Sequence, residues 1–230
     1  MQNLSKLEEK LSLKFKNEDL LIQALTHRSY LNENPNFKVG HNERLEFLGD
    51  AVLELAVTES LYLKYPDKPE GELTNFRASL VNSKILSDLA VDLELNDFLL
   101  LSRGEAKDMG RARQIILANA FEALIGALYL DQGYNPAKTF IENFLMPRLD
   151  KIVSEKLYKD PKSLFQEEAQ ERVGITPNYD VLKEWGPDHD KHFIVGVYLG
   201  NELVAEGEGY SKQTAQEEAA RLALKIKNWI

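Results

Sequence analysis

Three carboxylates recur at helical spacing in the segment HNERLEFLGD, which contains Glu43, Glu46 and Asp50. A helix turns by about 100° per residue, so these side chains fall within roughly 60° of one another. A helix face of this kind can bind a hard cation through its oxygens, or it can be a solvated acidic surface. Taken alone, the triplet favours the solvated surface.

A second segment, residues 115–128, is almost wholly apolar and is interrupted by two polar side chains, Asn119 and Glu122. An ionised carboxylate among apolar residues is costly unless it is paired or bound to a cation, and this segment contains no Lys or Arg. If the two segments pack together, their polar side chains form a cluster of oxygen ligands that suits Mg²⁺ or Mn²⁺. Such ions typically serve phosphoryl chemistry, in which they activate water and stabilise the leaving oxygen.

The elements that would position these residues are helices throughout the first 152 residues, because apolar side chains recur there every three to four positions. Helices are predicted over residues 3–14, 18–27, 41–64, 71–80, 83–93, 112–132 and 136–152. After a charged segment at 153–159, the pattern changes.

Residues 160–230 begin with a helix to about Val173, for which Asp160 is the N-cap and Pro161 lies in the first turn. Three β-rich segments follow, and a last helix is predicted over 211–227. This α-β-β-β-α order predicts a small two-layer α+β domain, in which two helices cover a three-stranded antiparallel sheet. The chain is therefore predicted to be multidomain, with an all-α domain at 1–152, a linker at 153–159 and an α+β domain at 160–230.

Composition excludes several classes of function. The 230 residues contain no cysteine, so there is no disulfide, thiol nucleophile or cysteine zinc site. The polar N-terminus is unlike a signal peptide, and no apolar run reaches the roughly 18 residues of a membrane span, so we expect a cytoplasmic protein with no membrane partner. Phosphate-binding glycine motifs are absent, so no nucleotide cofactor is indicated. The net charge of −9 argues against a polyanionic partner, unless bound cations hold it.

The segments HNERLEFLGDA, GELTNFRASLVN and ANAFEALIGALYLD, with the α-β-β-β-α unit, resemble bacterial ribonuclease III. That family has an endonuclease domain followed by a double-stranded-RNA-binding domain, and the resemblance covers nearly the whole chain. It implies that catalytic Mg²⁺ is ligated by Glu46, Asp50, Asn119 and Glu122, of which Asp50 and Glu122 are the most critical for hydrolysis. It further implies accessory acids in the same valley at Glu43, Glu70 and Glu105.

The resemblance also implies a homodimer, in which Phe47 packs into the partner subunit and each active site cuts one strand of an RNA duplex. The expected products have staggered ends with 5′-phosphates and 3′-hydroxyls. The expected roles are processing of ribosomal RNA precursors and of some messenger and transfer RNAs.

One position departs from the family pattern, because Asn119 stands where the family usually has Asp. An amide oxygen can ligate a hard cation, but it adds no negative charge and should weaken metal binding. Either the site tolerates a neutral ligand, which we favour, or cleavage is slowed while RNA binding is retained. The chain could then be a double-stranded-RNA-binding protein with weak or no cleavage. A third interpretation is that the acidic cluster is only a dimer surface.

In the second domain, DPKSLFQEEAQ, GPDHDKHF and GYSKQTAQEEAA resemble the three contact regions of a double-stranded-RNA-binding domain. The resemblance implies that Gln166, Gln170 and His189 contact minor grooves, and that Lys212 contacts phosphates where Ser211 caps the last helix. Without the resemblance, the glutamines could be ordinary exposed helix residues and the histidine merely solvated.

Two histidines, His27 and His41, precede the acidic residues in the sequence. Thr26-His27-Arg28-Ser29 resembles the first motif of the family in residue type, but His27 has no Ser-His-Asp partner set. We interpret His27 as structural. His41 is not required as a ligand, because hard cations do not need imidazole.

Overall fold

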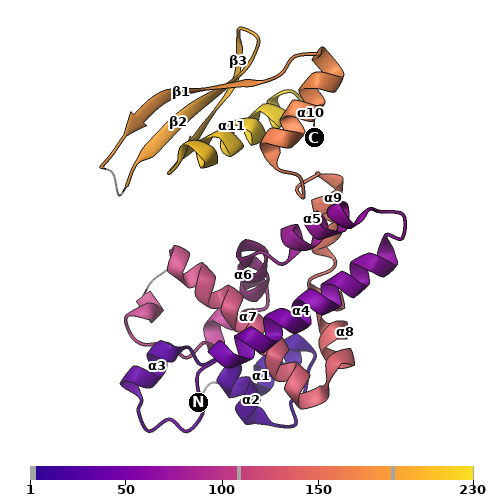
Figure 1. Cartoon of the computed structure of the whole chain (residues 1–230). Helices are drawn as coiled ribbons and strands as arrows, with labels where there is room; N and C mark the ends of the chain where they lie inside the picture. The colour runs from indigo at the N-terminus through magenta and orange to yellow at the C-terminus, as the bar shows by residue number, and fades with distance from the viewer. Residues whose placement is uncertain (1–3, 108–109, 188–189, 230) are drawn as a thin grey trace. The chain divides into compact units, whose positions relative to one another are not determined.

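The structure is a computed structural model that describes residues 4–107, 110–187 and 190–229. The chain divides into two compact units, residues 1–150 and 151–230 (Figure 1). Each unit is described by itself below. The helix α9 (Arg148–Ser154) spans the division.

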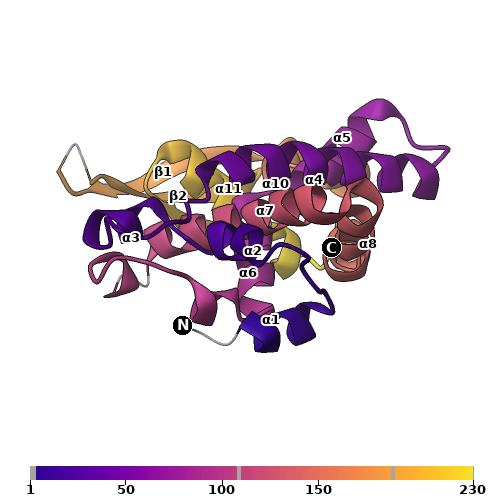
Figure 2. The ribbon, with the colours of Figure 1, turned by 90° about the horizontal axis from the view of Figure 1, so that it is seen from below.

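The first unit is helical, as the sequence predicts. Its elements are α1 (Leu4–Leu11), α2 (Glu18–Ala24), α3 (Arg28–Glu33), α4 (Glu43–Lys64), α5 (Glu70–Leu80), α6 (Ser83–Asp92), η1 (Leu95–Phe98), η2 (Glu105–Lys107), α7 (Arg111–Gln132) and α8 (Tyr134–Phe144). The two longest helices, α4 and α7, pack side by side at the centre (Figures 1 and 2). This pair carries the predicted ligands.

Helix α7 is the core helix of the first unit. By length and composition alone, this helix could cross a membrane. Most of its apolar side chains are instead buried, and Phe121, Leu124 and Leu128 have no exposed surface. α2, α4, α6 and α8 all pack against it.

Two features of the first unit differ from the prediction. α3 was not predicted, because its six residues include none that is buried and so carry no apolar periodicity. The single helix predicted over 136–152 is two helices, α8 and α9. Pro147 lies between them; it cannot donate a helical hydrogen bond, and its ring disfavours helical geometry at Met146.

The second unit has the predicted α-β-β-β-α order. Its elements are α10 (Pro161–Val173), β1 (Asn178–Trp185), β2 (His192–Leu199), β3 (Glu202–Gly209) and α11 (Lys212–Ile226). The strands form an antiparallel sheet in the order β1-β2-β3. Both predicted N-caps are confirmed, since Asp160 accepts from the Ser163 amide and Ser211 forms a capping box with Thr214.

The core of the second unit lies between the sheet and the two helices. Phe165 of α10 stacks on Trp229 with ring centroids 5.3 Å apart, and both are buried. α11 lies directly on β3 at Gly207, where an added Cβ would come within 2.2 Å of the Ala219 nitrogen. Small residues therefore set the spacing between helix and sheet.

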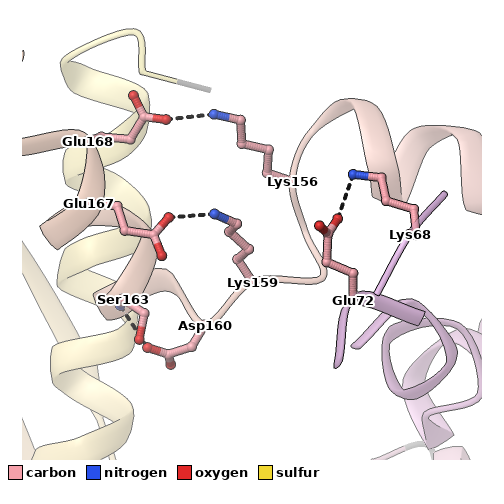
Figure 3. A network of polar contacts seen from close by, with 8 residues as sticks. All are labelled: Lys68, Glu72, Lys156, Lys159, Asp160, Ser163, Glu167 and Glu168. Carbon is pink, nitrogen blue, oxygen red and sulfur yellow. Dashed lines mark hydrogen bonds and ion pairs between the residues drawn. The ribbon is translucent and has the colours of Figure 1, made fainter. Parts of the chain in front are cut away.

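A buried carboxylate anchors α10 to the preceding segment. Glu168 is 5% exposed and pairs with Lys156 at 2.6 Å (Figure 3). It also pairs with Arg172 at 2.7 Å. Hydrogen bonds from Lys156 and Arg172 hold the pKa of Glu168 below its usual value, although burial opposes them. A depressed carboxylate pKa contributes stability above the unfolded-state pKa, and this contribution is lost as pH falls through the folded-state pKa.

We therefore expect Glu168→Gln to destabilise the second unit by about 1–2 kcal/mol at pH 7, after allowance for solvent screening of its half-exposed partners. Both tryptophans lie in residues 151–230, so tryptophan fluorescence during denaturant unfolding reports on this unit within the full chain. The difference from wild type should shrink below about pH 4. Glu167→Gln is the control, because the Lys159–Glu167 pair beside it is exposed (Figure 3). An equal loss in both variants would contradict the expectation.

Candidate active site

Two glycines let α4 and α7 touch backbone to backbone. A Cβ at Gly49 would lie 1.8 Å from the Glu122 carbonyl oxygen, and one at Gly126 would lie 2.2 Å from the Leu45 carbonyl oxygen. No side chain fits between helices at this separation. The predicted ligands lie within one turn of this crossing, so the crossing brings both ligand-bearing segments to one place.

The side chains predicted as ligands interact across the crossing. Asn119 donates a side-chain hydrogen bond to Glu46, which partly offsets the effect of burial and of Glu43 in raising the pKa of Glu46. Burial, followed by the charges of Asp50 and Glu46, raises the pKa of Glu122 to about 7. The acids of both helices therefore repel one another, as side chains in one cluster do.

The donor chemistry of this cluster fits a hard divalent cation. Three carboxylates and one amide oxygen are available, and the charges acting on Glu122 are all negative. A cation would relieve both the burial cost and the repulsion. Within the part of the chain that the structure describes, no three Asp, Glu or His side chains already lie close enough together to hold a metal ion.

Of the predicted accessory acids, Glu43 acts on this cluster and Glu105 acts on His27. Glu43 contributes to the raised pKa of Glu46 and lies 3.4 Å from Arg28. The negative charges of Glu105, on η2, and of Glu43 both favour a higher pKa for His27. The sequence did not predict that His27 interacts with both acids, because α3 and η2 carry too little apolar pattern to be placed.

Glu70 does not join the other acids within one chain. It begins α5, where its carboxylate accepts from Thr74, and it lines a groove with Tyr62 of α4. Tyr62 is 16 residues after Glu46 on the same helix, which at 1.5 Å per residue is about 24 Å away. Within a single copy of the chain, Glu70 therefore lies apart from the predicted ligands, and its role as an accessory acid stays a prediction.

The outward side of α4 is unusually apolar. Phe47 is 82% exposed, and Leu55 and Tyr62 are also exposed. These residues follow one another at seven- or eight-residue spacing, so they form one stripe along the helix. Phe47, the predicted dimer contact, is thus free of packing within its own chain.

The predicted RNA contacts of the second unit lie on α10 and at the start of α11. Gln166 and Gln170 are exposed, and Gln170 donates to Thr176 at 2.6 Å. Lys212 is exposed in the first turn of α11, directly after its cap Ser211. His189 lies outside the described residues. Sequence reasoning missed Lys162, whose ammonium donates to Gln216 at 2.6 Å and joins the two helices.

Comparisons with known proteins agree with this architecture. Residues 17–149 match the family model described as Ribonuclease-III-like, and residues 161–227 match the double-stranded RNA binding motif. Ribonuclease 3 of Bdellovibrio bacteriovorus is 45% identical over 227 residues, which cover 98% of this chain and 97% of that protein. The chain belongs to the ribonuclease III family. As a member of this family, the protein is an endoribonuclease. The family resemblance and the fold class predicted from the sequence are both confirmed.

Further relatives support the same assignment. Ribonuclease 3 of Natranaerobius thermophilus is 46% identical over 222 residues, covering 96% of this ribonuclease III and 95% of that protein. A solved nuclease domain of ribonuclease III from Campylobacter jejuni has 44% identity and a TM-score of 0.58, covering 63% of this chain and 97% of that one. The description of that structure refers to flexibility in a region involved in dimer formation.

Proposed function

We propose that this ribonuclease III hydrolyses double-stranded RNA with Mg²⁺, for which Mn²⁺ can substitute. The observation that carries the proposal is the Gly49–Gly126 crossing, where acids and an amide meet and the neighbouring charges acting on Glu122 are those of Asp50 and Glu46. Glu46, Asp50, Asn119 and Glu122 would hold the ion. When bound, the ion supplies water activation and stabilisation of the leaving 3′-oxygen.

The protein side chains have distinct tasks in this reaction. Asp50 and Glu122 bring negative charge from the two helices, and that charge draws the ion to the crossing. Asn119 contributes an amide that can turn its oxygen toward the ion instead of donating to Glu46. The cleaved duplex would carry 5′-phosphate and 3′-hydroxyl ends at staggered positions.

A homodimer fits both the stripe on α4 and the position of Glu70. The exposed Phe47 would be buried against a second copy, and exposed apolar stripes of this kind are typical of interfaces. Because Glu70 is remote from the acids of its own chain, a second copy could supply its Glu70 to them. The two-unit division at residue 150 is compatible with a nuclease domain, a joint at 153–159 and an RNA-binding domain.

The second unit would hold the duplex. Exposed amides at Gln166 and Gln170 suit 2′-hydroxyls, and the capped start of α11 with Lys212 suits phosphates. The acidic net charge is compatible with RNA binding, because the bound cations would neutralise the acids of the nuclease site. The proposed substrates are ribosomal RNA precursors and some messenger and transfer RNAs, in the cytoplasm.

A second candidate function is duplex binding with little cleavage. The observation that favours it is the Asn119 amide, which hydrogen-bonds to Glu46 and adds no charge for an ion. Both functions require duplex binding, so a binding assay does not separate them.

Mg²⁺ titration of cleavage separates the two functions. We expect the wild-type protein to cut a long labelled RNA duplex, and Asn119→Asp to lower the Mg²⁺ concentration for half-maximal cleavage by about tenfold, because a carboxylate binds Mg²⁺ more strongly than an amide. Asn143→Asp, an exposed change on α8, controls for added charge and should leave the titration unchanged. If only Asn119→Asp cuts, the chain is a duplex-binding protein. If neither cuts at any Mg²⁺ concentration, the proposed function fails.

A further inference from the structure

We propose that His27 and Ser29 are positioning residues for the nuclease reaction, because they hold in place the 102–107 loop, which carries Glu105. The inference rests on the proposed function. It assigns a task to a motif that sequence reasoning interpreted as structural.

A chain of hydrogen bonds runs from the start of α3 to Glu105. The Ser102 backbone amide donates to the Ser29 hydroxyl oxygen at 3.1 Å. The Ser102 hydroxyl oxygen in turn accepts from the Glu105 backbone amide at 3.3 Å, and the Ser102 carbonyl accepts from Ala106 at 2.9 Å. Ser29 thus holds the residue that caps the turn carrying Glu105.

His27 fixes the other side of Ser29. The Nδ1 atom of His27 accepts from the Ser29 amide at 3.3 Å and lies 2.8 Å from the Ser29 hydroxyl oxygen. Because that hydroxyl oxygen accepts from Ser102, its own hydrogen is free to be donated to Nδ1. Assigned from these contacts, the proton of a neutral ring is on Nε2. The backbone of His27 donates to Leu100 at 3.0 Å, so the histidine is anchored to the strand-like segment that enters the loop.

Both accessory acids, Glu105 and Glu43, are close enough to His27 for their charges to act on its ring. Burial lowers the pKa of His27, and the charges of Glu105 and then Glu43 oppose that shift. A neutral ring leaves the charge of both acids available to a cation, while its Nε2–H remains as a donor. Arg28 lies 3.4 Å from Glu43, and the Arg103 amide donates to Glu33 at 3.2 Å, so α3 contacts both α4 and the loop.

A purely structural role makes a different prediction. As the N-cap of a six-residue helix, His27 would add about 1 kcal/mol of stability and nothing to ion affinity. The positioning role instead predicts that the loss of the Ser29 hydroxyl loosens Glu105 and weakens the response to Mg²⁺ without changing duplex binding.

The test compares Ser29→Ala, Ser29→Thr and His27→Asn in the full chain. Asn at 27 keeps a side-chain acceptor for the cap but has no counterpart of Nε2–H. Asn82→Ala is the matched control, because it removes the N-cap of α6 at a site outside the acidic cluster. Cleavage is measured against Mg²⁺ concentration, duplex affinity is measured in EDTA, and hydrogen exchange is followed at the Ser102 and Glu105 amides.

We expect Ser29→Ala to raise the Mg²⁺ concentration for half-maximal cleavage by about tenfold and to speed exchange at both amides, with duplex affinity within about twofold. Ser29→Thr restores the hydroxyl and should restore both readouts. His27→Asn should also raise the Mg²⁺ requirement. An unchanged Mg²⁺ requirement in Ser29→Ala, or the same rise in Asn82→Ala, overturns the inference. If the wild-type protein cuts nothing, the proposed function fails, and unchanged exchange in Ser29→Ala would separately refute the hydrogen-bond chain.

Discussion

The Glu122→Gln variant is expected to bind RNA duplexes like the wild-type protein and to cut them about a thousandfold more slowly, a loss of about 4 kcal/mol of transition-state stabilisation. Glu122 is the acid that α7 contributes to the crossing, and the amide of Gln cannot replace its charge. Asp50 and Glu46 cannot compensate, because both belong to the opposite helix.

The same variant is expected to be more stable than the wild-type protein when no cation is present. Burial and the neighbouring acids raise the pKa of Glu122 from 4.5 to about 7. For an acid whose pKa is raised by folding, stability falls as pH rises from the unfolded-state to the folded-state value. Gln does not ionise, so at pH 8 in EDTA the Glu122→Gln variant should have a free energy of unfolding higher than that of the wild-type protein by on the order of 2 kcal/mol.

Thermal unfolding followed by the helical circular dichroism signal, beside a cleavage assay in Mg²⁺, checks both expectations. Glu142→Gln is the control, because this exposed acid of α8 pairs with Lys138 outside the crossing. It should leave cleavage unchanged. Undiminished cleavage by Glu122→Gln would mean that the cluster is a surface without a role in hydrolysis. Reduced stability at pH 8 would mean that Glu122 is held by an interaction other than the ones described.

Gly49→Ala is expected to cost about 2–4 kcal/mol of stability in the first unit. The new methyl group would overlap the Glu122 carbonyl oxygen, and backbone atoms cannot rotate away as a side chain can. The helices must separate, and the gain in helix propensity of Ala over Gly, about 1 kcal/mol, is too small to offset this. Separation also moves the acids of α4 away from those of α7, so the remaining folded protein should need more Mg²⁺ to cut.

Gly71→Ala is the matched control for this expectation. Gly71 lies in α5 of the same unit, and an added Cβ there meets nothing within 4 Å. This variant should be as stable as the wild-type protein or slightly more stable. Denaturant unfolding followed by helical circular dichroism distinguishes the two. If Gly49→Ala matched Gly71→Ala, α4 and α7 would not touch at the crossing.

Much of the fold follows from local pattern. The apolar periodicity of α4 and α7, the caps at Asp160 and Ser211, and the alternation of the three strands are short-range properties, and all are present in the structure. Short elements escaped prediction for the same reason. α3 has no buried face, and the break at Pro147 interrupts an otherwise continuous apolar pattern.

The sequence by itself determined which side chains could hold a cation, because their types and their spacing on two helices are local facts. It could not place the acids outside those helices. Only the tertiary structure decided that the Gly49–Gly126 crossing brings the predicted ligands together, that Glu105 is tied through Ser102 to α3, and that Glu70 of α5 lies beside the distant end of α4. The physical reason is that helix contact distance and loop position depend on atoms far apart in the chain, and residue spacing carries no information about them.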